Sequence, residues 1–310
     1  MDLLIQVALL VIGFAMLVKG ADWFVDGAAG IASKFGIPQL VVGLTIVAMG
    51  TSAPEAAVSI TAAMKGTADI AVGNVVGSNI LNILIILGLT GFIATVAVQK
   101  STLVAEIPFM LLITVVLIVM GMNGGSINFI EGIILWVLFI IYLVYLFILA
   151  RKGKNEEDKP ETRPVWKLLL LGVVGGVIVV WGSNITVDAA TSIAEAMKLS
   201  EKFIGLTIVA LGTSLPELVT SVTAARKGNA DIAIGNIVGS NIFNILFVLG
   251  TSALIIPITF VNTFLIDGIV AIAAGVLLWI ATFRKKELNR PWGIVMLLGY
   301  VAYFVYLVMV

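Results

Sequence analysis

The chain has no cysteine and no histidine among its 310 residues, and few of its residues are charged. The absence of cysteine excludes disulfides, thiolate metal sites and cysteine nucleophiles. Without histidine, the chain also lacks the commonest zinc ligand and the side chain that most easily changes charge near neutral pH. Eighteen basic and eighteen acidic residues give a net charge of zero, which indicates no electrostatic attraction to nucleic acid.

Hydrophobic residues make up 60% of the chain and the mean hydropathy is +1.16, whereas a soluble domain contains roughly 45–50% apolar residues. Several segments contain no charged residue over eighteen or more positions: 70–99, 107–130, 168–187 and 232–266. Each is long enough to cross the hydrocarbon layer of a membrane, about 30 Å thick, as a helix. The composition therefore predicts an all-α polytopic membrane protein.

Apolar stretches between charge clusters and Gly, Asn or Pro breaks predict ten transmembrane helices. Their expected ranges are 2–19 (with a continuation towards 33 left open), 38–64, 70–92, 102–122, 127–150, 165–187, 201–225, 231–256, 263–283 and 291–309. The charged segment RKGKNEEDKPETRP, residues 151–164, separates the fifth helix from the sixth. The chain thus divides into a first five-helix unit at 1–150, a linker at 151–164 and a second unit at 165–310.

The basic residues predict the orientation of these helices, because cytoplasmic loops carry an excess of lysine and arginine. With the N-terminus outside, fifteen basic residues lie on the cytoplasmic side, and only Lys65, Lys198 and Lys202 lie on the other side. We therefore expect a multi-pass protein of the cell membrane, with a cytoplasmic linker and both termini extracytoplasmic.

An internal repeat joins the two units. Residues 43–88 and 205–250 align without a gap at an offset of 162, and 33 of the 46 aligned pairs are identical. The elements GTSxPE, KGxADIAxGN and VGSNIxNIL occur in both copies in the same order. Five predicted helices separate the copies, so the second is expected to be inverted in the membrane relative to the first. Inverted repeats are typical of transporters that bind their substrate near the midplane.

Glu55 and Glu217 occupy equivalent positions deep in apolar segments of the two copies. An acidic side chain at the centre of a membrane helix costs roughly 2.5–3.5 kcal/mol even on the mildest scales. No lysine or arginine lies in the central part of any predicted span, so a metal cation is the expected partner. Two carboxylates balance one divalent ion. The alternative is that both glutamates are protonated or reach towards the membrane surface.

Hydroxyl groups precede each glutamate on the same helix face. Thr51 lies four residues before Glu55, and Ser52 lies three residues before it. The second copy repeats this spacing with Thr213 and Ser214. These oxygens are expected to add to a cation cage, although serine and threonine in membrane helices also bond to their own backbone.

Pro54 and Pro216 follow these hydroxyls and are expected to free backbone carbonyls at 48–50 and 210–212, because proline has no N–H group. Carboxylate, hydroxyl and carbonyl oxygens are the ligands that Ca2+ binds six to eight at a time. Na+ suits the same chemistry, whereas softer metals favour histidine or cysteine.

A second polar group occurs at 73–82 and 235–244. Its GxxxG patterns favour close helix packing. Ser78 with Asn82, and Ser240 with Asn244, share a helix face at a spacing of four residues and are expected to reach the same cation site. For the asparagines at 74 and 236 the sequence leaves two roles open, a ligand or a helix-to-helix hydrogen bond. No transport role is assigned to the remaining acidic residues of the apolar segments and their ends: Asp22, Asp26, Asp69, Glu106, Asp188, Asp231 and Asp267.

At GTSAPE/GTSLPE and GNVVGSNILN/GNIVGSNIFN the sequence resembles the Ca2+/cation antiporter superfamily, specifically its prokaryotic Na+/Ca2+ exchangers. The resemblance implies ten helices in two inverted five-helix repeats, with four cation sites between helices two, three, seven and eight. It also implies that helices one and six slide over this core. The ligands it implies are Ala48, Thr51, Ser52, Glu55, Ser78, Asn82, Ala210, Thr213, Ser214, Glu217, Ser240 and Asn244, with the two alanines contributing carbonyls.

The expected function is therefore antiport of Na+ against Ca2+, with these ions as substrates, no cofactor and a monomer in the bilayer. Asn244 departs from relatives that carry aspartate there, notably K+-dependent exchangers, so this chain resembles the K+-independent ones. Ca2+/H+ antiport and K+-dependent Na+/Ca2+ antiport remain alternatives, and a cation channel is a more distant one. The symmetric acids and hydroxyls come with no separate nucleophile motif, so an enzyme is not expected.

Overall fold

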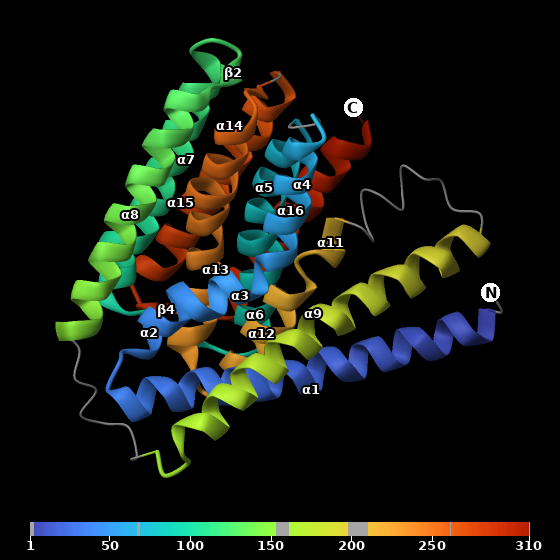
Figure 1. The fold of residues 1–310 in the computed structure, drawn as a ribbon, viewed down its shortest axis with the longest axis vertical. Helices are drawn as coiled ribbons and strands as arrows, with labels where there is room; N and C mark the ends of the chain where they lie inside the picture. The colour runs from blue at the N-terminus through green and yellow to red at the C-terminus, as the bar shows by residue number, and fades with distance from the viewer. Residues whose placement is uncertain (1–2, 67–68, 153–160, 198–209, 261, 310) are drawn as a thin grey trace.

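The computed structural model describes residues 3–66, 69–152, 161–197, 210–260 and 262–309. These residues form a helical bundle whose members run roughly side by side, with two long helices, α1 and α9, lying obliquely across it (Figure 1). Eight helices of the described residues are long and apolar enough to cross a membrane, and one bent helix pair brings the number of candidate spans to nine. The prediction of a helical, multi-span protein is confirmed at this level.

Helices α1 (Leu3–Phe35) and α9 (Val165–Ala196) are longer than the expected 2–19 and 165–187. They run antiparallel with their backbones in contact: Gly13 lies against Gly182, and Gly27 lies against Gly172. Because glycine has no side chain, it allows helix backbones to approach closely. This packing keeps both segments helical past the charged residues that were interpreted as membrane boundaries.

We expect Gly175→Ala to destabilise the protein, because the added Cβ would lie 2.4 Å from the backbone nitrogen of Phe24 and 2.8 Å from the Gly20 oxygen. Overpacking of this kind costs about 1–3 kcal/mol. Gly172→Ala on the same helix is the matched control, because its Cβ would have no neighbour within 4 Å among the described residues. Thermal unfolding in detergent should show a lower midpoint for Gly175→Ala only. Equal midpoints would contradict a close backbone contact at this position.

The expected span 38–64 is broken at its centre. It consists of α2 (Gln39–Val42), the π-helical segment η1 (Gly43–Val47), α3 (Ala48–Thr51) and α4 (Ala53–Met64). Ser52 leaves helical geometry at φ −83° and ψ 8°, and the two halves meet at 52°. Pro54 contributes to the break because it cannot donate a backbone hydrogen bond to the preceding turn.

The second copy of the repeat has the same break. α11 (Ala210–Gly212) is followed by Ser214, at φ −91° and ψ 5°, and then by α12 (Leu215–Arg226). The expected seventh span, 201–225, begins outside the described residues. Within the part that is described, the GTSxPE motif therefore produces the same local structure in both copies.

The GNxVGSNIxN motif forms the most buried helices. The first copy contains α5 (Asp69–Leu81), the π-helical segment η2 (Asn82–Leu87) and α6 (Gly88–Ile93). The second copy contains α13 (Ala230–Phe243), the π-helical segment η5 (Asn244–Leu249) and α14 (Gly250–Ile255). A Cβ on Gly239 would lie 2.7 Å from the Leu44 oxygen, so this glycine allows α13 to pack against η1. The packing role predicted for the GxxxG pattern is thus confirmed in the second copy.

The remaining helices enclose these central segments (Figure 1). They are η3 (Thr102–Glu106), α7 (Ile107–Met122), α8 (Phe129–Lys152), α15 (Asn262–Phe283) and α16 (Arg290–Met309). Short antiparallel strand pairs, which were not predicted, join the connections: β1 (Val96–Ala97) with β4 (Glu287–Leu288), and β2 (Ser126–Ile127) with β3 (Ile258–Thr259).

Candidate cation site

The two helix breaks place Glu55 and Glu217 inside the protein. Glu55 is 1% exposed and Glu217 is 0% exposed, and each lies in the first turn of its half-helix, α4 or α12. The N-terminus of a helix carries a partial positive charge, which stabilises a carboxylate there. The breaks therefore position both carboxylates in the same part of the bundle and at favourable helix ends.

Hydroxyl groups connect the two copies across the site. Ser52 Oγ donates a hydrogen bond to Glu217 Oε1 at 2.7 Å, and Ser214 Oγ donates to Glu55 Oε1 at 3.2 Å. Each serine therefore donates a hydrogen bond to the glutamate of the other copy. Thr51 Oγ1 also reaches the opposite copy, where it donates to Asn236 Oδ1 at 3.0 Å. The predicted serines are thus brought together with both glutamates, through partners that lie about half the chain away.

Asn74 and Asn236 join neighbouring helices. Asn74 Nδ2 donates to Ser59 Oγ at 2.9 Å and to the Glu55 carbonyl at 3.3 Å, which links α5 to α4. Asn236 Nδ2 makes the equivalent bonds to Ser221 Oγ at 2.9 Å and to the Glu217 carbonyl at 3.4 Å. Of the two roles left open by the sequence, the structure shows the helix-to-helix hydrogen bond.

Four asparagines form a ring between α5/η2 and α13/η5. Asn79 Nδ2 donates to the Asn241 carbonyl, and Asn241 Nδ2 donates to the Asn79 carbonyl, both at 3.2 Å. Asn82 Nδ2 donates to Asn241 Oδ1 at 2.9 Å, while Asn244 Nδ2 donates to Asn79 Oδ1 at 3.2 Å. The ring fixes which end of each amide faces its neighbour. Sequence reasoning did not assign a role to Asn79 or Asn241, although both lie in the repeated GSNIxN motif.

Four oxygens of the central side chains are buried and have no hydrogen-bond partner: Glu55 Oε2, Glu217 Oε2, Asn82 Oδ1 and Asn244 Oδ1. A buried acceptor without a partner costs about 1–3 kcal/mol, and more when it is charged. All four are hard oxygen ligands of the kind that Ca2+ and Na+ prefer. No group of three His, Cys, Asp or Glu side chains gathers among the described residues, so the negative charge of this site comes from two carboxylates.

The other predicted ligands lie around this centre. The Ala48 carbonyl accepts the Ser52 N–H at 3.0 Å and the Ser240 hydroxyl at 3.4 Å, so Pro54 does not free it from the helix. A carbonyl has two lone pairs, and a cation would share this oxygen with those donors. Ser78 is 3% exposed on α5. Ala210 begins α11, and its side chain lies outside the described part of the chain.

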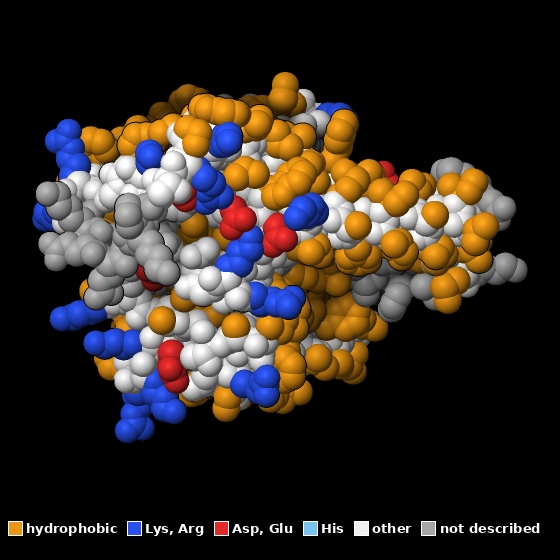
Figure 2. Space-filling model, turned by 90° about the horizontal axis from the view of Figure 1, so that it is seen from below, with side chains coloured by type: hydrophobic (Ala, Val, Ile, Leu, Met, Phe, Trp, Pro, Cys, Tyr) orange, Lys and Arg blue, Asp and Glu red, His pale blue; other side chains and the backbone are white. Residues whose placement is uncertain are grey.

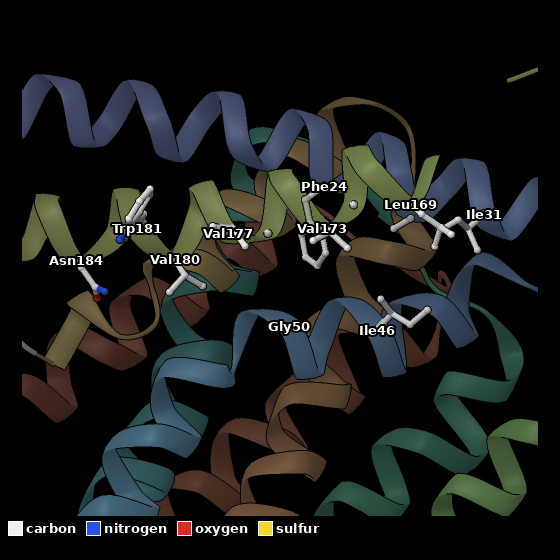
Figure 3. Close-up of a pocket in the computed structure, with 13 residues that line it drawn as sticks. Phe24, Ile31, Ile46, Gly50, Leu169, Val173, Val177, Val180, Trp181 and Asn184 are labelled. Carbon is white, nitrogen blue, oxygen red and sulfur yellow. The ribbon is translucent and has the colours of Figure 1, made fainter. Parts of the chain in front are cut away.

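Two cavities lie between the α1–α9 pair and the broken spans. One of about 490 Å³ lies between α4 and α9 and is bordered by Pro54 and Thr213, next to the central glutamates. Another, of about 670 Å³, lies between the α1–α9 pair and the first half of the broken span, and its lining includes Phe24 of α1, Val177 of α9, and Ile46 and Gly50 of the broken span (Figure 3). The first cavity borders α4 from Ala53 to Val58, and a separate cavity borders the rest of α4 as far as Lys65.

Comparison with known proteins gives consistent matches over most of the chain. A family described as sodium/calcium exchanger protein matches residues 5–148 and 167–309. The putative antiporter CaxA of Alkalimonas amylolytica is 36% identical over 317 residues, covering 97% of this chain and 98% of its own length. The sodium/calcium exchanger MaX1 of Methanosarcina acetivorans is 33% identical over 343 residues, covering 96% of this chain and 97% of its own.

The fold is also similar to solved structures of the sodium-calcium exchanger NCX_Mj. The structure soaked with 10 mM Na+ and 10 mM Sr2+ matches with a TM-score of 0.86 and 33% identity, covering 98% of this chain and 99% of that chain. The family match covers both units, and both relatives extend over nearly the whole chain. The chain therefore belongs to the sodium/calcium exchanger family.

Proposed function

We propose that this protein exchanges Na+ for Ca2+ across the cell membrane by alternating access, with both ions binding in turn between Glu55 and Glu217. The observation that carries the proposal is the set of four buried, unpartnered oxygens on Glu55, Glu217, Asn82 and Asn244. Two of them belong to carboxylates and two to amides, so one Ca2+ neutralises the centre. The relatives' names, which include a sodium/calcium exchanger and a putative antiporter, support the same ions and the same type of transport.

The proposed ligands occupy equivalent places in the two copies. In the first copy they are the Ala48 carbonyl, Thr51, Ser52, Glu55, Ser78 and Asn82. In the second they are the Ala210 carbonyl, Thr213, Ser214, Glu217, Ser240 and Asn244. The hydrogen bonds from Ser52 to Glu217 and from Ser214 to Glu55 support a single shared centre, because they bring the two sets together.

The proposed architecture is ten transmembrane helices in two inverted five-helix units, 1–150 and 165–310. The antiparallel packing of α1 and α9 supports the inversion, because these helices begin the two units. The orientation follows from the basic residues: the linker is cytoplasmic and both termini are extracytoplasmic.

A labelling experiment tests this orientation. The native chain has no cysteine, so Lys152→Cys and Met309→Cys each introduce a unique thiol. In intact cells, an impermeant thiol reagent should modify the cysteine at position 309 and should reach the one at 152 only after the membrane is permeabilised. The reverse pattern would contradict the orientation.

Transport in proteoliposomes tests the choice of ions. Uptake of radiolabelled Ca2+ should be driven by an outward Na+ gradient, and not by an outward K+ or H+ gradient of the same size. The Ca2+/H+ and K+-dependent alternatives are the outcomes in which H+ drives uptake, or in which Na+ drives it only when K+ is present. The amide at Asn244 favours uptake driven by Na+ alone, because an amide adds no third negative charge to the cation site.

A further inference from the structure

Lys227, at the C-terminal end of α12, forms ion pairs with two aspartates of α1. Lys227 Nζ lies 2.8 Å from Asp26 Oδ1 and 3.2 Å from Asp22 Oδ1, and it donates to the Asp22 carbonyl at 3.0 Å. Figure 2 shows basic and acidic side chains next to one another on the side from which α1 and α9 are seen. From the sequence, neither aspartate was expected to have a transport role. Because Lys227 follows the half-helix that carries Glu217, this contact connects the site's own helix to the α1–α9 pair.

The repeat places the same residue types at the other end of the protein. At the offset of 162 that relates the two copies, Lys65 is the equivalent of Lys227. Residues 20–35 of α1 and 182–197 of α9 also align without a gap at this offset, so that Asp188 matches Asp26 and Asn184 matches Asp22.

The two ends differ in the structure. Lys65 and Asp188 are both exposed, and the salt bridges found among the described residues do not include this pair. The cavity of about 490 Å³ next to the glutamates lies between α4 and α9, with Asp188 and Asn184 on its wall. A second cavity of about 490 Å³ continues along α4 to Lys65. The Lys65 end is therefore open, whereas the Lys227 end is closed by contact.

Equivalent positions of α4 and α12 show the same difference. Val58 on α4 is 44% exposed, while its equivalent on α12, Thr220, is 0% exposed. Ala57 is exposed, and its equivalent Val219 packs against Leu17 and its neighbours on α1 and α9. The residues at these two positions differ between the copies, but the contacts differ as well: α12 packs against the α1–α9 pair there, whereas α4 faces the cavity, so the pair lies closer to α12 than to α4 at these positions.

We propose that Lys227 with Asp26 and Asp22, and Lys65 with Asp188 and Asn184, form two alternating latches that control access to the cation site. The proposal rests on the inverted architecture and alternating access proposed above. When the α1–α9 pair moves, the Lys227 latch opens and the Lys65 latch closes, because inverted repeats exchange conformations between the two states. Close packing of α1 on α9, together with the cavities along α9, allows the pair to move as one unit.

The labelling rate of an introduced cysteine reports which of the two latches is closed, and it does so without a transport measurement. Ala57→Cys lines the open cavity and is the reporter. Lys227→Ala in this background removes the latch that is closed in this structure and should shift the equilibrium away from the open-cavity state by roughly two- to five-fold, the range expected for a partly exposed ion pair. Labelling of the cysteine should slow by up to this factor, because its rate follows the fraction of molecules in which the cavity is open. Lys65→Ala should not slow it. Lys152→Ala, at an exposed position far from both latches, is the matched control and should leave the rate unchanged.

Charge reversal tests the pairing itself. Lys65→Asp should reduce Na+-driven Ca2+ uptake, and the double variant Lys65→Asp with Asp188→Lys should restore much of it. Unchanged labelling in Lys227→Ala, or failure of the double variant to recover, would overturn the latch proposal. If the wild-type protein moves no Ca2+ at all, the ion assignment is wrong, but the labelling shift still decides whether the latches exist.

Discussion

Replacing either Glu55 or Glu217 by glutamine is expected to reduce Na+-driven Ca2+ uptake by roughly 30-fold or more. Glutamine keeps the size of the side chain and an oxygen that can accept the bond from Ser214 or Ser52. It removes one of the two charges that face the divalent ion in a buried site. Losing one partner of a buried charge pair typically costs about 2–5 kcal/mol, which corresponds to this reduction.

Glu106→Gln provides the matched control. Glu106 is as buried as Glu55, at 1% exposed, but it lies beside Tyr145 on a different part of the bundle. Its replacement should leave uptake close to the wild-type rate, and size-exclusion profiles of all three variants should show folded protein. Near-normal uptake by Glu55→Gln or Glu217→Gln would mean that the affected carboxylate does not bind Ca2+.

Asn244→Asp is expected to make transport depend strongly on pH or K+. Asn244 Nδ2 donates to Asn79 Oδ1 at 3.2 Å, and its own Oδ1 has no partner. An ionised aspartate has no hydrogen to donate, so two oxygens would face each other across this contact. The carboxyl group must then hold a proton or attract an additional cation. We expect uptake to depend on pH or K+ several-fold more strongly in the variant than in the wild type.

In the Asn244→Asp variant, the side chain of Asn79 should determine how readily the new carboxyl group loses its proton. In the double variant Asn79→Ala with Asn244→Asp, the facing oxygen is absent, so the ionised form is disfavoured less. The pH midpoint of uptake should therefore be lower in the double variant than in Asn244→Asp alone. Measurement of uptake against pH with the membrane potential held fixed separates the two variants. Identical pH profiles would show that the ring contact between positions 79 and 244 does not control this charge.

The central glutamates were predictable from the sequence, because an unpaired acid in an apolar segment is costly and the repeat placed two of them at equivalent positions. Pro54 was expected to free carbonyls at 48–50, but the 52° break of the span after Thr51 was not predicted. The serine partners were not predictable either. Ser52 shares a helix with Glu55 at a spacing that suggests a local contact, but its hydroxyl bonds to Glu217, 165 residues away. No spacing rule within one helix reveals a contact across two copies of a repeat.

The ring residues were missed for a related reason. Asn79 and Asn241 lie beside Ser78 and Ser240 in the repeated GSNIxN motif, and their side-chain amides bond to backbone carbonyls of the opposite copy, which the sequence does not show. The end of α1 was left open between 19 and about 33 because Lys19, Asp22 and Asp26 resemble the end of a membrane span. In the structure, α1 continues to Phe35, and both aspartates pair with Lys227. In each case the sequence shows the residue type, and the packing of distant segments decides its partner.

Obligatory exchange is tested most directly by the release of Na+ in response to Ca2+. Proteoliposomes loaded with radiolabelled Na+ are diluted into medium without Na+, and Ca2+ is then added outside with the membrane potential held at zero. The proposed mechanism predicts that Na+ leaves rapidly only when Ca2+ is present, and that Glu55→Gln abolishes this release. Rapid loss of Na+ without Ca2+ would indicate a channel, and retention of Na+ after Ca2+ is added would contradict Na+/Ca2+ exchange.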